Sequence, residues 1–443
     1  MIGGSITANI MLGTALLGAT AGVIGTFAVL RRRALVGDML SHAALPGICL
    51  AFLVMNSRNR LGLSIGALVT GLLGIVLVGV ITRWTRTKED AAIGIVLSTF
   101  FGAGVVLLSK IQQDQSGNQA GLGTYLFGET ASISRSDIQL IAGMAAVCLV
   151  IVILLFKEFE LLSFDSDFAT SQGWPALALD LLMMGTLTIV TIVGLPICGV
   201  ILMAALIILP GAAARFWTNR LGPLLVIAGI FGGASGMIGT FLASPLPERW
   251  FGSERVRALL NASLLPPGPL IVLSAAAIFL FSLLFAPRRG IVAENLAELR
   301  LRIRISREHM LRALYELSEP QLPNRPQIDE KTLLAQRHWS NWVLNWWLWR
   351  FSAQGLIERD RETAQLTPAG LAAAAQVTRT HRLWELFLVE SAGIASDHVD
   401  RDADDVEHML PAPLIRKLEA RLAASGRMPV VSQIVPESPH ELL

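Results

Sequence analysis

Long apolar runs dominate the first two thirds of the sequence. Nine of them, at about 18 to 22 residues each, are long enough to cross a bilayer as helices. A chain in lipid must satisfy its backbone hydrogen bonds internally, so apolar runs of this length predict membrane helices. The sixth and seventh runs are separated only by a short Gly- and Pro-containing stretch, so the count has an uncertainty of one. The expected spans are 9–30, 40–56, 61–82, 91–109, 138–156, 176–196, 198–215, 223–244 and 268–287.

The composition changes near residue 287. The whole chain is 53% hydrophobic and only 16% charged, but the segment after Pro287 is charged and helix-forming, as in ENLAELRLRIRISREHMLRALYEL. We therefore expect a membrane domain at 1–290 and a soluble domain at 291–443. The net charge of +2 is too small to indicate a partner, and the three cysteines lie in apolar runs, which disfavours a disulfide framework or a thiolate metal site.

The basic residues between the spans predict the orientation of the membrane domain. With the N-terminus outside, the inner loops receive the densest basic cluster, Arg31 to Arg33, and nine spans place the soluble domain in the cytoplasm. The other basic residues expected inside are Arg83, Arg86, Lys88, Lys157, Arg215, Arg220, Arg288 and Arg289. Glycine-rich spans such as GIFGGASGMIG predict close packing between helices.

Two ionisable residues occur where the second span begins, in RRRALVGDMLSHAALPG. Asp38 and His42 are four residues apart, so on a helix they share one face. A carboxylate and an imidazole placed in this way can coordinate a divalent transition metal, and ionisable groups at membrane depth usually mark a pathway. The alternative is that both residues lie at the headgroup level, with Asp38 near the positive end of the helix dipole.

A polar insertion, KEFELLSFDSDFATSQGWP at 157–175, separates the fifth and sixth spans on the expected inner side. It predicts a short helix on the membrane face, and an ordinary connecting loop is the alternative. The chain lacks the pattern G-x-x-x-x-G-K-[ST], so a nucleotide site of the P-loop type would have to be on another polypeptide.

Three stretches in the same order resemble the permease subunits of manganese, zinc and iron ABC importers. They are RRRALVGDMLSHAALPGICLAF, FDSDFATSQGWP and GVILMAALIILPGAAAR. The resemblance implies an all-α polytopic domain of the type II ABC importer kind, with Asp38 and His42 in the metal path. It implies partners as well: an ABC ATPase subunit, an extracytoplasmic metal-binding protein and a second permease copy, as a homodimer or heterodimer. The residues expected to dock into the ATPase are Phe164, Asp165, Asp167, Phe168, Ala169, Gly173 and Pro175.

The soluble segment predicts a winged helix. Helical spacing in 306–319, two more helices in 328–355 and two short strands in LIERDRETAQL are followed by Thr367-Pro368, which opens a long amphipathic helix. DADDVEHMLPAPLIRKLEARL predicts a further helix. Within HWSNWVLNWWLWRF the expected core residues are Leu344, Trp347, Leu348 and Phe351, and the residues expected on the opposite face are Trp342, Trp346 and Trp349.

This segment resembles the diphtheria-toxin-repressor class of metal-dependent regulators, through LTPAG, HRLWELFL and D-x-x-E-H-M-L. The resemblance implies a mainly α winged-helix and metal-binding, dimerising domain. Its primary metal site would map to His309, Asp404, Glu407 and His408, and its ancillary site to His381, Glu385 and Asp400. Two positions depart from the family: His309 replaces an Asp or Met, and Arg312 stands where the manganese-sensing branch has an acid. Solvated acidic faces are the alternative reading.

Together these patterns predict a non-enzymatic transporter subunit in a bacterial cytoplasmic (inner) membrane, with its soluble domain sensing Mn²⁺, Zn²⁺ or Fe²⁺ and inhibiting transport. One alternative is a bifunctional permease and repressor whose tail binds DNA. A DNA-reading helix needs phosphate-pairing cations and base-edge donors, whereas here three tryptophans accompany a single charge, Arg350. A second alternative is a secondary transporter that needs no ATPase.

Overall fold

The computed structural model describes residues 2–55, 59–113, 128–130, 133–244, 266–336, 339–392 and 435. The chain divides into two compact units, Met1–Glu294 and Asn295–Leu443. The helix expected in 402–422 lies outside the described residues.

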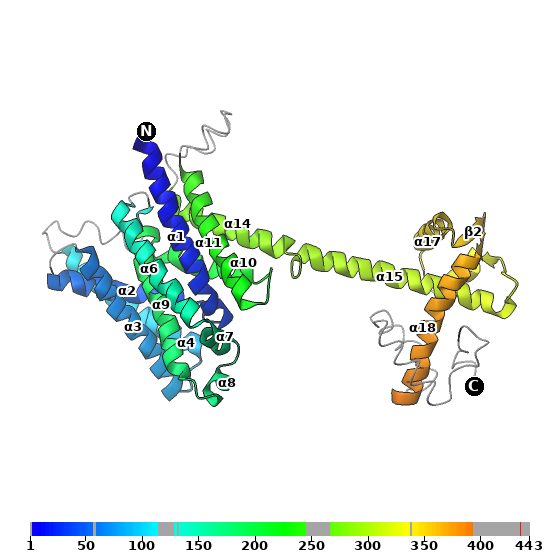
Figure 1. Ribbon diagram of the computed structural model, residues 1–443, viewed down its shortest axis with the longest axis horizontal. Coiled ribbons are helices and arrows are strands. Elements are labelled where there is room, and N and C mark those ends of the chain that lie inside the picture. Colours follow the sequence, from blue (N-terminus) through cyan, green and yellow to red (C-terminus); the bar gives the residue numbers. More distant parts are fainter. Residues whose placement is uncertain are drawn as a thin grey trace. The chain divides into compact units, whose positions relative to one another are not determined.

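The first unit is a bundle of apolar helices (Figure 1), as expected. Eight of its described helices contain a stretch that is long and apolar enough to cross a membrane. A ninth, α10, is apolar but has only 15 residues, or about 22 Å at 1.5 Å per residue, against a hydrocarbon core of about 30 Å. The helices are α1 (Ile2–Leu30), α2 (Val36–Met55), α3 (Arg60–Trp84), α4 (Glu89–Gln113), α6 (Arg135–Leu154), α9 (Ala176–Cys198), α10 (Val200–Ala214), α11 (Leu221–Ala243) and α14 (Pro267–Phe285).

A single glycine separates α9 from α10. Gly199 has φ +80°, a left-handed value that ends α9 and that only glycine adopts without strain. Residues of the loop before α6 donate hydrogen bonds to carbonyl groups at this helix end. The backbone N–H of Glu129 donates to the carbonyl of Pro196 at 3.0 Å, and the Thr130 hydroxyl donates to that of Ile197 at 2.8 Å. The break between α9 and α10 is therefore stabilised by hydrogen bonds within the bundle, and it explains why α10 is short.

Glycines allow α1 and α11 to approach at backbone distance. A Cβ added at Gly18 would lie 2.2 Å from the carbonyl oxygen of Gly232, so neither position can accept a side chain without moving a helix. The same holds between α2 and α3, where a Cβ at Gly66 would lie 2.4 Å from the Gly47 carbonyl oxygen. The structure thus confirms the close packing expected from the glycine-rich spans.

Contacts along α1 show which helix ends share a side of the unit. Gly18 faces Gly232, and the Thr14 hydroxyl lies 3.0 Å from that of Thr240, so α11 runs antiparallel to α1. Gly211, near the end of α10, lies against Thr26, near the end of α1. The last turns of α1 and α10 and the first turn of α11 are therefore on one side of the unit, which we call the α1-end side.

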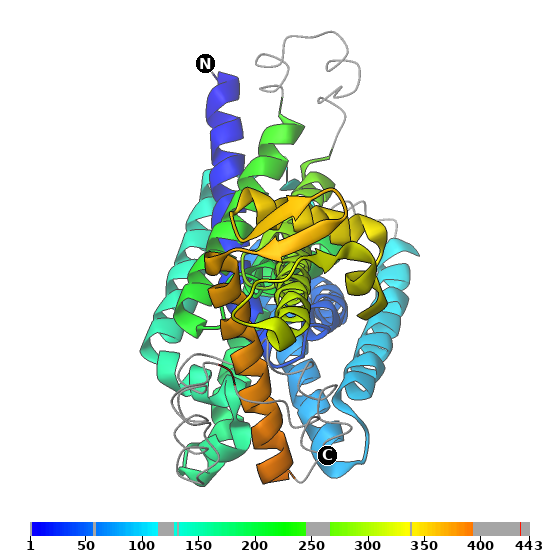
Figure 2. The ribbon, with the colours of Figure 1, turned by 90° about the vertical axis from the view of Figure 1, so that its right-hand side faces the viewer.

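The second unit contains a winged helix, as predicted. Its three-stranded antiparallel sheet has the order β1-β3-β2, with Ile328 opposite Ala364 and Ile357 opposite Leu366. Figure 2 shows the β2–β3 hairpin in yellow-orange. Besides most of α15 (Ile291–Ser318), the elements are η3 (Glu319–Gln321), β1 (Ile328–Asp329), α16 (Glu330–Gln336), α17 (Asn341–Ala353), β2 (Ile357–Asp360), β3 (Thr363–Leu366) and α18 (Pro368–Ala392).

Helix α17 buries the predicted face. Leu344, Trp347, Leu348 and Phe351 are in the core of this unit, with Leu348 and Phe351 fully buried. The expectation for the opposite face was wrong at one position, because Trp346 is half-buried and packs against the same core. Its ring also lies edge-on to that of Trp347, with the centroids 4.6 Å apart.

Candidate functional site

Asp38 and His42 lie together in the first two turns of α2. The imidazole Nε2 is 3.5 Å from the Asp38 carboxylate, so the two side chains share one face as their spacing predicts. The Phe101 ring of α4 packs edge-on against His42, with a centroid distance of 4.7 Å. The Asp38 and His42 side chains are 37% and 23% exposed in the single chain. One oxygen and one nitrogen ligand are thus presented at the surface of the bundle.

A complete metal site needs more ligands than this pair. Among the residues that the structure describes, no three His, Cys, Asp or Glu side chains come close enough to hold a metal ion. Further ligands would have to come from water, from another chain or from residues outside the described part.

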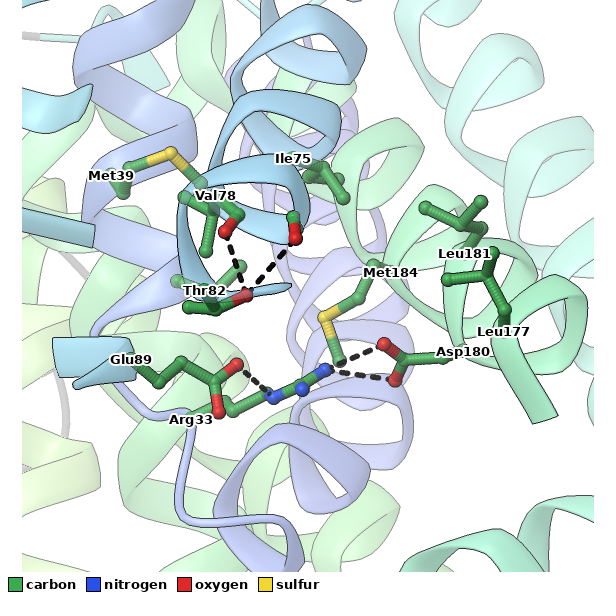
Figure 3. Close-up of a pocket in the computed structure, with 12 residues that line it drawn as sticks. Arg33, Met39, Ile75, Val78, Thr82, Glu89, Leu177, Asp180, Leu181 and Met184 are labelled. Atoms are coloured by element: carbon green, nitrogen blue, oxygen red, sulfur yellow. Dashed lines mark hydrogen bonds and ion pairs between the residues drawn. The ribbon is translucent and has the colours of Figure 1, made fainter. Parts of the chain in front are cut away.

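An ion-pair cluster lies on the α1-end side of the first unit and was not predicted from the sequence. In Figure 3 the Arg33 guanidinium lies between two carboxylates: it is paired with Glu89 of α4 and lies 2.8 Å from Asp180 of α9. Arg31 also contacts Asp180, at 2.6 Å. All four side chains are partly buried, so each charge depends on its partners. A signal was available, because an acid inside an apolar run, ALALDLLMM, usually marks a paired or functional position.

The cluster joins three parts of the bundle. Arg31 and Arg33 belong to the tight connection between α1 and α2, where Arg32 takes φ +60°. Glu89 is the first residue of α4, and Asp180 lies in the second turn of α9. Asp38 comes five residues after Arg33, so the start of α2 that carries it is held to both α4 and α9.

The predicted coupling segment forms two short helices, α7 (Phe156–Phe164) and α8 (Ser166–Ser171). The Asp165 carboxylate caps α8 by accepting the Phe168 N–H at 2.8 Å. Gly173 at φ +86° then turns the chain toward Pro175, which immediately precedes α9. Ala169 is buried and Asp167 is exposed.

Three aromatic side chains project from this segment. Phe164, Phe168 and Trp174 are 60%, 50% and 44% exposed. Phe164 ends α7, Phe168 lies on α8 and Trp174 follows α8, and several exposed large apolar side chains within one short segment are typical of a site that binds another protein. The segment leads directly into α9, and Asp180 lies in the second turn of that helix.

In the second unit, the structure places two of the predicted metal ligands together. His381 and Glu385 of α18 are 1% exposed, and their side chains lie 3.0 Å apart. His309 of α15 is half-buried. Asp400, Asp404, Glu407 and His408 lie outside the described residues. In the same unit, burial raises the pKa of Tyr315, and the charge of Glu319 raises it further.

Comparisons with known proteins agree with these features. The family model described as "ABC 3 transport family" matches residues 5–248. A second one, "Iron dependent repressor, metal binding and dimerisation domain", matches residues 367–436. Both matches support the families that the sequence motifs resemble.

Two curated relatives and one solved structure are similar to this chain. The manganese transport system membrane protein MntC of Bacillus subtilis (strain 168) is 39% identical over 95% of this chain and 92% of its own. The zinc transport system membrane protein TroC of Treponema pallidum is 38% identical over 64% of this chain and 90% of its own. PsaBC from Streptococcus pneumoniae in complex with Fab has a TM-score of 0.52 at 29% identity, covering 64% of this chain and 92% of that one.

Replacing Asp180 tests how much the ion-pair cluster contributes to the stability of the fold. Asp180→Asn leaves both guanidinium groups without their shared carboxylate, so we expect the free energy of unfolding to fall by about 2 to 4 kcal/mol. Thermal unfolding of the detergent-solubilised protein measures the effect. Asp90→Asn removes an exposed acid at the start of α4 and should have little effect; equal stability of the two variants would contradict the assignment.

Proposed function

The chain belongs to the ABC 3 transport family, and we propose that it is the membrane permease subunit of an ATP-driven importer for a divalent transition metal. We place the permease at residues 1–290 and a regulatory domain at 291–443. The observation that carries the proposal is the family match over residues 5–248, combined with an Asp–His pair on α2 and an exposed aromatic segment before α9. Its role is transport, with ATP hydrolysis assigned to a separate subunit.

Manganese, zinc and iron(II) are the proposed substrates. The relatives are named for manganese and for zinc, and an oxygen and an imidazole ligand suit all three metals. Asp38 and His42 would be transient ligands in the path. Transient binding by few ligands suits a transporter, because a step that held the metal in a full coordination shell would release it slowly.

We propose a second permease copy as the partner that covers Asp38 and His42. An ionisable pair at membrane depth costs free energy when it faces lipid, so such residues usually face protein or water. In the single chain the Asp38 side chain is 37% exposed, which supports an additional protein surface at this face of α2. The proposal is open as to whether the two copies are identical.

The ATPase partner is proposed to bind the segment 164–175. The chain has no P-loop, and the exposed rings of Phe164, Phe168 and Trp174 offer an apolar contact to another subunit. Movement of this segment would be passed to α9, through Asp180 to Arg33, and so to the start of α2. An extracytoplasmic binding protein would deliver the metal to the opposite side.

Multi-pass membrane permease relatives imply the cytoplasmic (inner) membrane, and we propose that the exposed apolar surfaces of α3, α4 and α6 face lipid there. We propose that the α1-end side is cytoplasmic, because it carries Arg31, Arg33 and the segment assigned to the ATPase. The N-terminus would then be outside. Residues 291–443 would lie in the cytoplasm, where internal metal could control transport.

Transcriptional regulation by the second unit is not favoured. Helix α17 exposes Trp342 and Trp349, which are 75% and 64% accessible. Its one cation, Arg350, stacks over the Trp346 ring at 5.1 Å from the centroid. This helix therefore offers a single cation to phosphate groups, and two large apolar rings occupy much of its exposed face, which argues against a DNA-binding role.

Metal uptake by cells that depend on this chain tests the path. Asp38→Asn and His42→Ala should each lower uptake by about tenfold or more, because losing even an outer-shell partner of a metal ligand typically costs 10- to 100-fold in affinity. Ser41→Ala is the control on the same helix, since that hydroxyl donates to the Gly37 carbonyl of the helix backbone at 2.9 Å. Full uptake by both variants at normal protein levels would remove the two residues from the path.

Coupling to the ATPase is tested at Phe168. Phe168→Ala removes a half-exposed ring from α8 and should abolish most metal-stimulated ATP hydrolysis by the assembled complex while leaving the permease folded. Thr170→Ala, an exposed position on the same helix, should keep normal stimulation. If the Phe168→Ala variant stimulates ATP hydrolysis as strongly as the Thr170→Ala control, the segment is not the ATPase contact.

A further inference from the structure

A buried polar cluster joins α15 to α18 in the second unit. Arg312 and Glu316 come from α15, and His381 and Glu385 come from α18. Arg312 is 7% exposed, and His381 and Glu385 are 1% exposed. The Arg312 Nε donates to Glu316 at 2.6 Å, and its Nη1 lies 3.0 Å from His381 Nδ1. His381 Nε2 lies 3.0 Å from Glu385 Oε1.

The donor and acceptor roles in this cluster follow from chemistry. A guanidinium has N–H donors and no acceptor, so His381 Nδ1 must accept the bond from Arg312. A neutral imidazole has one lone pair on its ring nitrogens, and here it is Nδ1 that offers it. Nε2 therefore carries the proton and donates a hydrogen bond to Glu385. The two hydrogen bonds thus run in one direction, from Arg312 to His381 and from His381 to Glu385.

These residues do not fit a metal ion as they stand. A metal bound by His381 would need a ring lone pair, and Arg312 already engages the one that is available. A divalent cation would also have to approach a guanidinium, which repels it. A guanidinium thus links two carboxylates and an imidazole that, among the described residues, do not converge closely enough to hold a metal ion.

We propose that Arg312 is a built-in cation that takes the place of a metal at His381 and Glu385. The contacts among Arg312, His381 and Glu385 then hold α15 to α18 at every metal concentration. His381 and Glu385 are therefore not a metal-sensing site. Another arginine joins the same regions, since Arg382 of α18 forms a two-pronged pair with Glu319 of η3, with one contact at 2.7 Å. This inference refines the proposed regulatory role, because metal sensing would fall to His309 and residues beyond the described part.

Metal stoichiometry of the full-length protein in detergent tests the proposal, with Mn²⁺ as the probe in equilibrium dialysis. Arg312→Glu exchanges the internal cation for a carboxylate, so we expect about one additional Mn²⁺ per chain relative to the wild type. The additional ion should also raise the Tm of this variant. Arg302→Glu is the matched control, with the same charge change on the same helix at a side chain that is 74% exposed and pairs with Glu298. It should bind as many Mn²⁺ ions as the wild type.

Glu385→Gln in the otherwise unchanged protein gives a second, independent measurement. The amide oxygen still accepts the His381 N–H, so the fold should be kept and the Mn²⁺ stoichiometry should equal that of the wild type. Loss of one Mn²⁺ would overturn the proposal, as would a folded Arg312→Glu variant that binds no additional ion. Neither readout involves uptake, so a failure of the proposed transport function would leave this result unaffected.

Discussion

The charges of Arg31 and Arg33 around Asp180 are the interaction on which the account of the first unit depends. Charged groups withdrawn from water cost free energy unless they are paired. Here the Asp180 carboxylate pairs with the guanidinium groups of both Arg31 and Arg33, and Glu89 forms a second ion pair with Arg33. The connection between α1 and α2 is thereby held to the starts of α4 and α9. Since α9 begins directly after the segment 164–175, the cluster connects the helix that follows this segment to the helix that carries Asp38 and His42.

The rest of the first unit provides a firm frame for this link. Backbone-to-backbone contacts at Gly18 and Gly232, and at Gly47 and Gly66, leave no space for sliding by side-chain rearrangement. At the break before α10, hydrogen bonds from Glu129 and Thr130 satisfy two carbonyl groups of α9. A bundle built in this way responds to force by moving whole helices, which is what switching a transport path between its two sides requires.

The sequence predicted the helices, their faces and their close packing well, because hydropathy and spacing are local properties. It predicted the Asp38–His42 and His381–Glu385 pairs for the same reason, since each is an i, i+4 pair on one helix. It did not predict Asp180 with Arg33, or Arg312 with His381, because these partners are 147 and 69 residues apart and only the fold brings them together. Trp346 was placed on the wrong face because its half-buried ring packs beside Trp347, a contact that helical periodicity does not report.

The central claim is that this chain moves a divalent metal only when a separate ATPase drives it. The most direct measurement is uptake of radioactive Mn²⁺ into proteoliposomes that contain the chain with or without its ATPase subunit, with the metal-binding protein present outside in every sample and ATP supplied on the side of the ATPase. We expect uptake only with both subunits and ATP, and none when a non-hydrolysable analogue replaces ATP. Equal uptake by the chain alone, driven by an ion gradient or by the metal gradient itself, would contradict it.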